Sequence, residues 1–211
     1  MAVVVVGGQA RKVGKTSVVA GLISAIGERR WTAIKISGDI HEDFPGTPST
    51  LIAAGRGFVL TEEPVAGLRT GHGRRLELPP AARDTARFVA AGAERVYWLQ
   101  AESDCLAEAM PHLRTIIAAS DGDVIVESNG IMQWMTPDLY LLVLDFGVEE
   151  FKPSARRTLH QATTFLLHRD REEPLWQGVS LPGRPMLSMC PPQYVTPEIV
   201  EFVRRRLAHE S

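Results

Sequence analysis

The chain has 211 residues, 45% of them hydrophobic and 23% charged, as in a soluble globular protein with one α/β domain or at most two small ones. Its formal net charge of −2 argues against a general nucleic-acid binder, because such proteins carry a basic excess. The only two cysteines, Cys105 and Cys190, exclude a disulfide scaffold and a zinc ribbon, and no apolar run reaches the roughly 18–20 residues that span a bilayer, so we expect a cytoplasmic protein without a membrane partner.

A strand, a loop and a helix open the chain. Val3–Val6 is an uninterrupted β-branched run, which is typical of a strand that is buried on both faces. From Lys15 to Ile26 apolar residues recur at helical spacing, and Trp31–Ile36 is predicted to be the second strand. This β–loop–α–β order indicates the start of a parallel α/β sheet.

An irregular stretch follows, from about residue 37 to residue 80. It contains seven glycines and five prolines with little periodicity, and it is too long for an ordinary connection. We expect a mobile or functional insertion there, with one short hairpin around Phe58–Leu60.

Strands and helices alternate in the rest of the chain. Further strands are expected at Arg95–Leu99, Asp123–Glu127, Leu139–Asp145, Thr163–Leu167 and Pro185–Met189. Helices are expected at Ala82–Ala91 and at Ser154–His160. Another helix is expected to begin after Asp104, which would be its N-cap, and the last is expected to run from Pro197 to about Leu207 with Thr196 as N-cap. Pro111 should kink the helix that follows Asp104 or delay its start. The alternation predicts one three-layer, doubly wound α/β domain over residues 1–211, with a mostly parallel sheet.

The segment Gly8-Gln9-Ala10-Arg11-Lys12-Val13-Gly14-Lys15-Thr16 has the composition of a phosphate-binding loop. It joins a buried strand to a helix, and the backbone N–H groups at a helix N-terminus attract phosphate oxygens. Lys15 is expected to reach the β- and γ-phosphates, and the Thr16 hydroxyl to bind Mg²⁺. The predicted nucleotide-binding set also includes Gly8, Lys12, Val13, Gly14 and Ser17. The usual loop has a glycine where Gln9 stands.

Such a loop needs a carboxylate that holds the metal or orients the attacking water. Glu127 ends the apolar run DVIVE, and the carboxyl ends of parallel strands face the ligand crevice. We therefore predict that Glu127 binds the metal and takes part in catalysis, with Asp39 competing for the metal. Lys35, near the end of the second strand, is predicted to aim its ammonium at a phosphate or an anionic substrate; a snorkelling edge-strand lysine is the alternative.

Gly14-Lys15-Thr16 and the strands that end in Lys35 and Glu127 resemble a group of P-loop NTPases. The group includes dethiobiotin synthetase and the molybdopterin-guanine dinucleotide biosynthesis accessory protein B. Residues 84–93 resemble the D-(S/T)-x-R-x-x-x-A-G-A stretch of the accessory protein, whereas the spacing from Gly8 to Gly14 resembles that of dethiobiotin synthetase.

The resemblance to the accessory protein implies a GTP-binding protein with Mg²⁺ and weak hydrolysis. Such a protein is often a homodimer and assists a cofactor-biosynthesis enzyme that attaches a nucleotide to molybdopterin. By matched position, the resemblance also implies that Asp84 lies near the nucleotide or the substrate.

The identity of the base and the type of reaction stay open. His168-Arg169-Asp170 follows a late strand, where related folds place the residues that read the purine, so Asp170 is a candidate to bind guanine and GTP is favoured over ATP. A charged surface turn is the alternative for this segment. Two other functions are consistent with the sequence: an ATP-dependent ligase or kinase, like dethiobiotin synthetase, acting on a small anionic substrate, and a nucleotide-switched interaction module without significant turnover.

Overall fold

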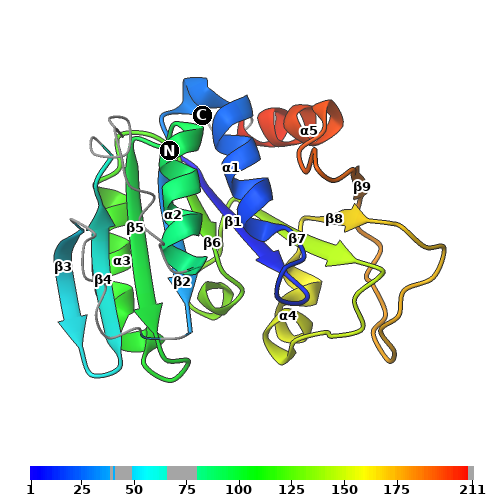
Figure 1. The fold of residues 1–211 in the computed structure, drawn as a ribbon, viewed down its shortest axis with the longest axis horizontal. Helices are drawn as coiled ribbons and strands as arrows, with labels where there is room; N and C mark the ends of the chain where they lie inside the picture. Colours follow the sequence, from blue (N-terminus) through cyan, green and yellow to red (C-terminus); the bar gives the residue numbers. More distant parts are fainter. Residues whose placement is uncertain (39, 41–48, 66–79, 209–211) are drawn as a thin grey trace.

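The computed structural model describes residues 1–38, 40, 49–65 and 80–208 (Figure 1). Within these ranges the strands form one nine-stranded sheet, in the order β3-β4-β5-β2-β6-β1-β7-β8-β9. Strand pairing is parallel from β5 to β9 and antiparallel only where β3 and β4 join the β5 edge. The sheet is therefore mostly parallel, as the alternation of strands and helices predicted.

The elements follow the predicted chain order. The strands are β1 (Val3–Gly8), β2 (Thr32–Ser37), β3 (Thr50–Gly55), β4 (Phe58–Glu63), β5 (Arg95–Ala101), β6 (Val124–Glu127), β7 (Leu139–Asp145), β8 (Thr164–His168) and β9 (Met186–Met189). The helices are α1 (Lys15–Ala25), α2 (Pro80–Ala91), α3 (Leu106–Ala118), α4 (Pro153–Thr158) and α5 (Pro197–Ala208).

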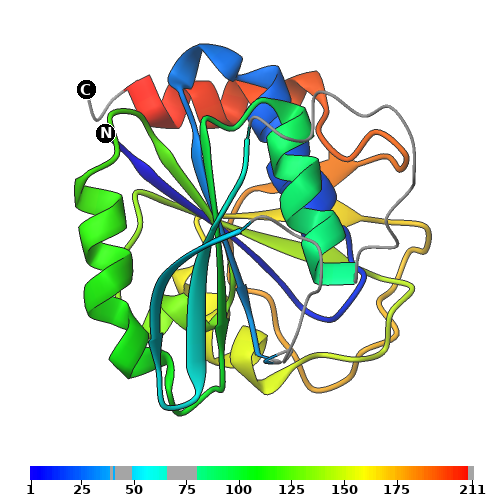
Figure 2. The same ribbon diagram turned by 60° about the vertical axis from the view of Figure 1, so that its left-hand side comes forward.

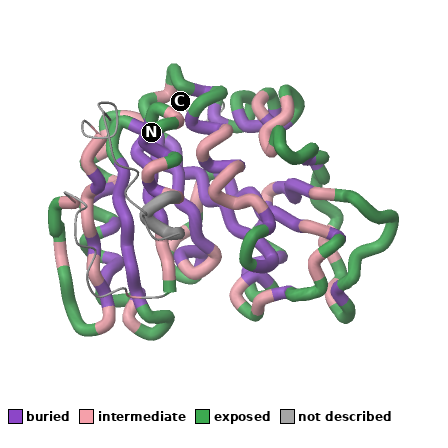
Figure 3. Tube along the Cα trace, in the orientation of Figure 1, coloured by how far each residue is buried: buried purple, intermediate pink, exposed green. Residues whose placement is uncertain are grey.

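Helices cover both faces of the sheet, which makes the fold a three-layer α/β structure. Residues of α1, α2 and α5 pack in one hydrophobic cluster with one face, whereas α3 and α4 belong to the cluster on the other face. Figure 2 shows α3 on the opposite side of the sheet from α1 and α2. Buried residues are concentrated in the central strands β1, β6 and β7, whereas the edge strand β3 is largely exposed (Figure 3).

One prediction about α3 was wrong. The helix begins at Leu106 with Cys105 as N-cap and without a side-chain cap, so Asp104 does not cap it. The N–H of Cys105 instead donates to the carbonyl of Glu102, in a turn that leads directly into the helix. Pro111 lies inside the helix without delaying its start. By contrast, the predicted cap of α5 is confirmed, because the hydroxyl of Thr196 accepts a hydrogen bond from the N–H of Ile199.

Part of the irregular segment between residues 37 and 80 joins the sheet. β3 and β4 form a hairpin around Arg56-Gly57, longer than the one predicted, and β4 pairs with β5. Phe58 and Leu60 are buried in the cluster that contains α3, which fixes the hairpin to the domain core. Asp39 and most of the remainder of the predicted insertion lie outside the described residues. None of the described helices has both the length and the apolarity needed to cross a membrane.

Candidate functional site

The loop between β1 and α1 has two residues in the left-handed backbone region. Gly14 has a φ of 101°, and a side chain there would overlap the ring of Tyr194, so the position requires glycine for both backbone and space. Lys12 has a φ of 62°, which is uncommon for a residue with a long side chain. Unfavourable backbone of this kind persists where surrounding structure enforces it, and it clusters at ligand-binding loops.

Gln9 replaces the usual loop glycine without disturbing the loop. The non-glycine residues with positive φ in the described chain do not include Gln9, so its backbone needs no glycine. Its buried amide accepts a hydrogen bond from the N–H of Asp145 (2.8 Å) and donates to the carbonyls of Val148 (2.9 Å) and Glu150 (3.3 Å). Gln9 therefore fastens the loop to the segment that follows β7.

Asn129 holds the other side of the loop. Its Oδ1 accepts from the N–H of Gly8 and its Nδ2 donates to the carbonyl of Gly8, both at 2.8 Å. Asn129 follows β6, which pairs with β1. Hydrogen bonds thus tie the end of β1 and the start of the loop to two other parts of the chain, the residue after β6 and the segment after β7.

The N-terminus of α1 is suited to an anion. Gly14 is the N-cap, no side chain caps the helix, and its first turn contains no acidic residue. The first N–H groups of a helix have no partner within the helix, and the helix dipole favours negative charge there. The hydroxyl of Ser17 in this turn accepts a hydrogen bond from Nη2 of Arg87 on α2 (2.9 Å).

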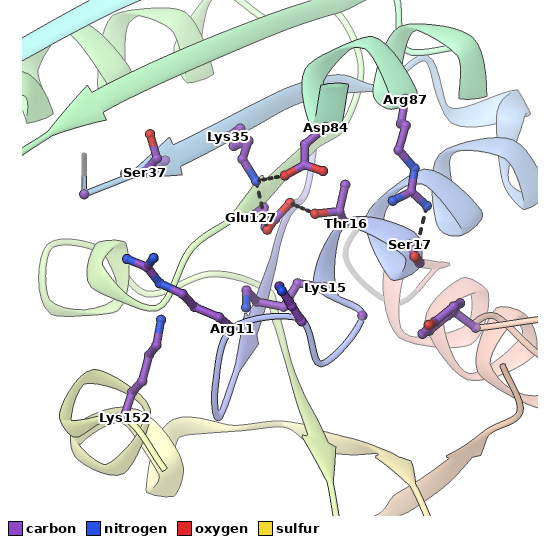
Figure 4. Close-up of a pocket in the computed structure, with 15 residues that line it drawn as sticks. Arg11, Lys15, Thr16, Ser17, Lys35, Ser37, Asp84, Arg87, Glu127 and Lys152 are labelled. Carbon is purple, nitrogen blue, oxygen red and sulfur yellow. Dashed lines mark hydrogen bonds and ion pairs between the residues drawn. The ribbon is translucent and has the colours of Figure 1, made fainter. Parts of the chain in front are cut away.

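Four of the predicted site residues form one polar network beside this helix end (Figure 4). Thr16 Oγ1 donates to Glu127 Oε2 (2.9 Å), and Lys35 Nζ lies 3.2 Å from Glu127 Oε1 and 2.7 Å from Asp84 Oδ2. Lys35 and Glu127 are direct neighbours in the register of the parallel strands β2 and β6. Because both are buried, the arrangement of this network is tightly constrained.

Lys15 lies next to the network with an unusual titration behaviour. Its Nζ donates to the carbonyl of Ala10 (2.8 Å). The pKa of Lys15 is lowered to about 8, mainly by burial; Glu127 and Asp84 raise this pKa, whereas Lys152 and Lys35 lower it. Since burial disfavours the charged form of Lys15, an anion bound beside it would stabilise that charged form strongly.

These groups line a cavity of about 700 Å³. Its lining includes six basic side chains and two acidic ones, from Arg11, Lys12, Lys15, Lys35, Arg87, Lys152, Asp84 and Glu127. The whole sequence has four lysines among its 23 basic residues, and all four line this cavity. In a chain with a net charge of −2, this concentration of cations indicates a site for a polyanion.

Arg11, Arg87, Lys152 and Tyr194 line the cavity without having been predicted. Because the sequence has only four lysines, Lys152 could have been singled out from the sequence. Among the predicted residues, Val13 is packed in the hydrophobic core. Gly8 lies under Lys15, since a side chain at Gly8 would meet Lys15 Cγ at 2.8 Å.

Asp170 is not among the residues that line the cavity. Its carboxylate lies beside Gly147, where a side chain on the glycine would meet Asp170 Oδ2 at 2.9 Å. Nearby, His168 Nδ1 and Asp145 Oδ2 are 3.1 Å apart at the ends of β8 and β7. The segment that follows β8 thus contacts the segment that follows β7.

No protein-family model matches the sequence, and neither does a curated protein. Among solved structures, the chain is similar to the "apo" form of LpxK from Aquifex aeolicus in complex with ATP, with 16% sequence identity and a TM-score of 0.48. The similarity covers 90% of this chain and 54% of LpxK. The chain therefore spans about half the length of that structure.

Proposed function

We propose that this chain binds a nucleoside triphosphate together with Mg²⁺ at the loop from Gly8 to Thr16, and that it hydrolyses the nucleotide slowly or transfers its terminal phosphoryl group. The observation that carries this proposal is the cavity, which combines an open helix N-terminus, all four lysines of the chain and the network of Thr16 and Glu127. Phosphoryl transfer depends mainly on positioning and on stabilising charge, and these groups supply both.

Each group has a role that follows from its position. The N–H groups at the start of α1 and the ammonium of Lys15 would bind the β- and γ-phosphate oxygens. Thr16 and Glu127 fit Mg²⁺, because it prefers oxygen ligands and their oxygens lie 2.9 Å apart. A bound Mg²⁺ neutralises charge on the phosphates. Lys35 contacts Glu127 and Asp84, so its main role in this proposal is to position Glu127.

GTP is the first candidate nucleotide and ATP the second. The preference for GTP, and a role beside an enzyme of molybdenum cofactor biosynthesis, rest on the resemblance of residues 84–93 to the accessory protein family. Because Asp170 does not line the cavity, it is not the base contact in this proposal. Tyr194 lies against Gly14 at the start of α1 and is the aromatic side chain placed to contact the nucleoside.

A second candidate function is a kinase or ligase with a small anionic substrate. The cavity lining also includes Ser37, Arg11 and Lys152, and the two cations among them offer charge beyond what the triphosphate itself needs. Phosphate release or transfer would then depend on the second substrate. Nucleotide binding with no turnover under any condition would favour the interaction module instead.

Calorimetric titration tests the proposal. GTP and ATP, each with Mg²⁺ at pH 7, are titrated into the wild type, into Lys15→Ala and into Arg157→Ala, an exposed residue of α4 outside the cavity. We expect micromolar binding of one nucleotide, unchanged in Arg157→Ala and weakened roughly 100-fold in Lys15→Ala, because a charge-assisted contact is lost. Absence of binding by both nucleotides, or equal binding by Lys15→Ala, would contradict the proposal.

A further inference from the structure

We propose that Arg11 and Lys152 form a second anion subsite, beyond the terminal phosphate, for a carboxylate or phosphate group of an acceptor substrate. This inference rests on the proposed function and specifies the substrate class of the same cavity. It assigns a role to two cations that the nucleotide contacts described above do not use.

The two side chains occupy one side of the cavity. In Figure 4 Arg11 and Lys152 extend into the space below Ser37, whereas Arg87 and Ser17 lie on the other side of Lys15. Lys152 is the N-cap of α4, and its N–H donates to the carbonyl of Gln9 (2.8 Å). The backbone of Lys152 is therefore tied to the phosphate loop that carries Arg11.

The direction of the bound phosphate chain follows from the loop. The backbone N–H groups of such a loop bind the α- and β-phosphates and the lysine reaches the β- and γ-phosphates. The chain of phosphates would thus run from the Ser17 side of the helix end past Lys15. Arg11 and Lys152 then lie where the next group in line would be, next to the phosphoryl group that is transferred.

Charge in the cavity supports an anion at this place. Among the described residues that line the cavity, six side chains are basic and two are acidic. A guanidinium offers a planar pair of donors and an ammonium a point charge, which together suit a carboxylate or a phosphate group.

A nucleotide with one phosphate more than a triphosphate probes the subsite. The experiment compares, with Mg²⁺ at pH 7, the Kd of a non-hydrolysable β,γ-imido triphosphate with that of the nucleoside 5′-tetraphosphate of the same base. The proteins are the wild type, Arg11→Gln/Lys152→Gln, and the control Arg157→Gln/Arg205→Gln, which removes the same charge at two exposed positions outside the cavity.

We expect the wild type and the control to bind the tetraphosphate at least tenfold more tightly than the triphosphate. In Arg11→Gln/Lys152→Gln this ratio should fall below threefold. A wild type without preference for the tetraphosphate, or a variant that weakens both nucleotides equally, would overturn the subsite and would leave the proposed function intact. Absence of binding by both nucleotides would instead overturn the proposed function.

A second titration separates the two kinds of acceptor. Inorganic phosphate and, separately, malonate are titrated into the complex of the wild type with the imido triphosphate and Mg²⁺. Saturable binding of phosphate alone assigns a phosphorylated acceptor, and saturable binding of malonate alone assigns a carboxylate acceptor. In both cases the variant Arg11→Gln/Lys152→Gln should no longer bind the anion. Saturable binding that this variant retains would contradict the subsite.

Discussion

Replacing Lys35 by methionine isolates the energetics of the buried charge network. The ammonium of Lys35 lies between the carboxylates of Asp84 and Glu127. The side chains of Lys35 and Glu127 are 9% and 7% exposed, whereas that of Asp84 is 28% exposed. Lys35→Met keeps a long apolar side chain in β2 and removes the positive charge. Two carboxylates then face each other with no cation between them.

The expected loss of stability follows from burial. Removing one partner of a buried ion pair typically costs about 3–5 kcal/mol, and the partial exposure of Asp84 favours the lower end, about 3 kcal/mol. For a protein of this size, 1 kcal/mol corresponds to roughly 2–4 °C in Tm. Lys35→Met should therefore lower Tm by roughly 6–12 °C and shift the urea midpoint accordingly, measured without nucleotide at pH 7.

Two further variants make this measurement decisive. Arg30→Met breaks an ion pair with Glu94 in which both side chains are about half exposed, so it should leave the urea midpoint almost unchanged because water screens the pair. Lys35→Met/Glu127→Gln removes one of the facing carboxylates and should recover more than half of the loss. The reasoning is refuted if Lys35→Met unfolds at the same midpoint as Arg30→Met, or if the double variant is no more stable than Lys35→Met.

Three other predictions concern the phosphate loop. Gln9→Gly restores the usual loop residue, yet it should destabilise the protein by about 2 kcal/mol in urea unfolding, because the partly buried N–H of Asp145 loses its partner. A variant as stable as the wild type would show that these hydrogen bonds contribute nothing. Gly14→Ala should abolish nucleotide binding in calorimetry, since the new methyl group overlaps the ring of Tyr194 at a positive φ, and unchanged affinity would disprove this. Because burial lowers the pKa of Lys15 to about 8, the free ammonium is partly deprotonated at pH 8.5 and a bound phosphate should restore the proton. Calorimetric titrations of the nucleotide at pH 8.5, in buffers of different ionisation enthalpy, should then report uptake of roughly three quarters of a proton per nucleotide bound. Binding without proton uptake would contradict the lowered pKa. The same shift means that the unfolded chain binds more protons than the folded one between about pH 8 and 10.5. The destabilisation that comes from burying the charged group is therefore relieved as the pH rises through that range.

The local features of this fold were accessible from the sequence. The strand, loop and helix from Val3 to Ala25 are encoded by contiguous residues, and so is the strand that ends in Glu127. Lys35 and Glu127 could be expected at the same edge because parallel strands place their carboxyl ends together. The structure places them as direct neighbours in register.

The remaining parts of the site depend on long-range packing. Tyr194 contacts Gly14 across most of the length of the chain, and no local pattern indicates that contact. The role of Gln9 was also hidden, because its hydrogen-bond partners follow β7. The cap of α3 was mispredicted since the turn from Glu102 to Cys105, rather than the side chain of Asp104, starts the helix.

The central claim is that one triphosphate occupies the cavity lined by all four lysines of the chain. Amine-reactive labelling, read by peptide mass spectrometry, tests it directly without any substitution. The amino group of Met1, whose residue is 64% exposed and does not line the cavity, serves as an internal control. The non-hydrolysable triphosphate with Mg²⁺ should slow the labelling of Lys12 and Lys15 at least tenfold and leave Met1 unaffected. Equal labelling rates with and without saturating nucleotide would contradict the account.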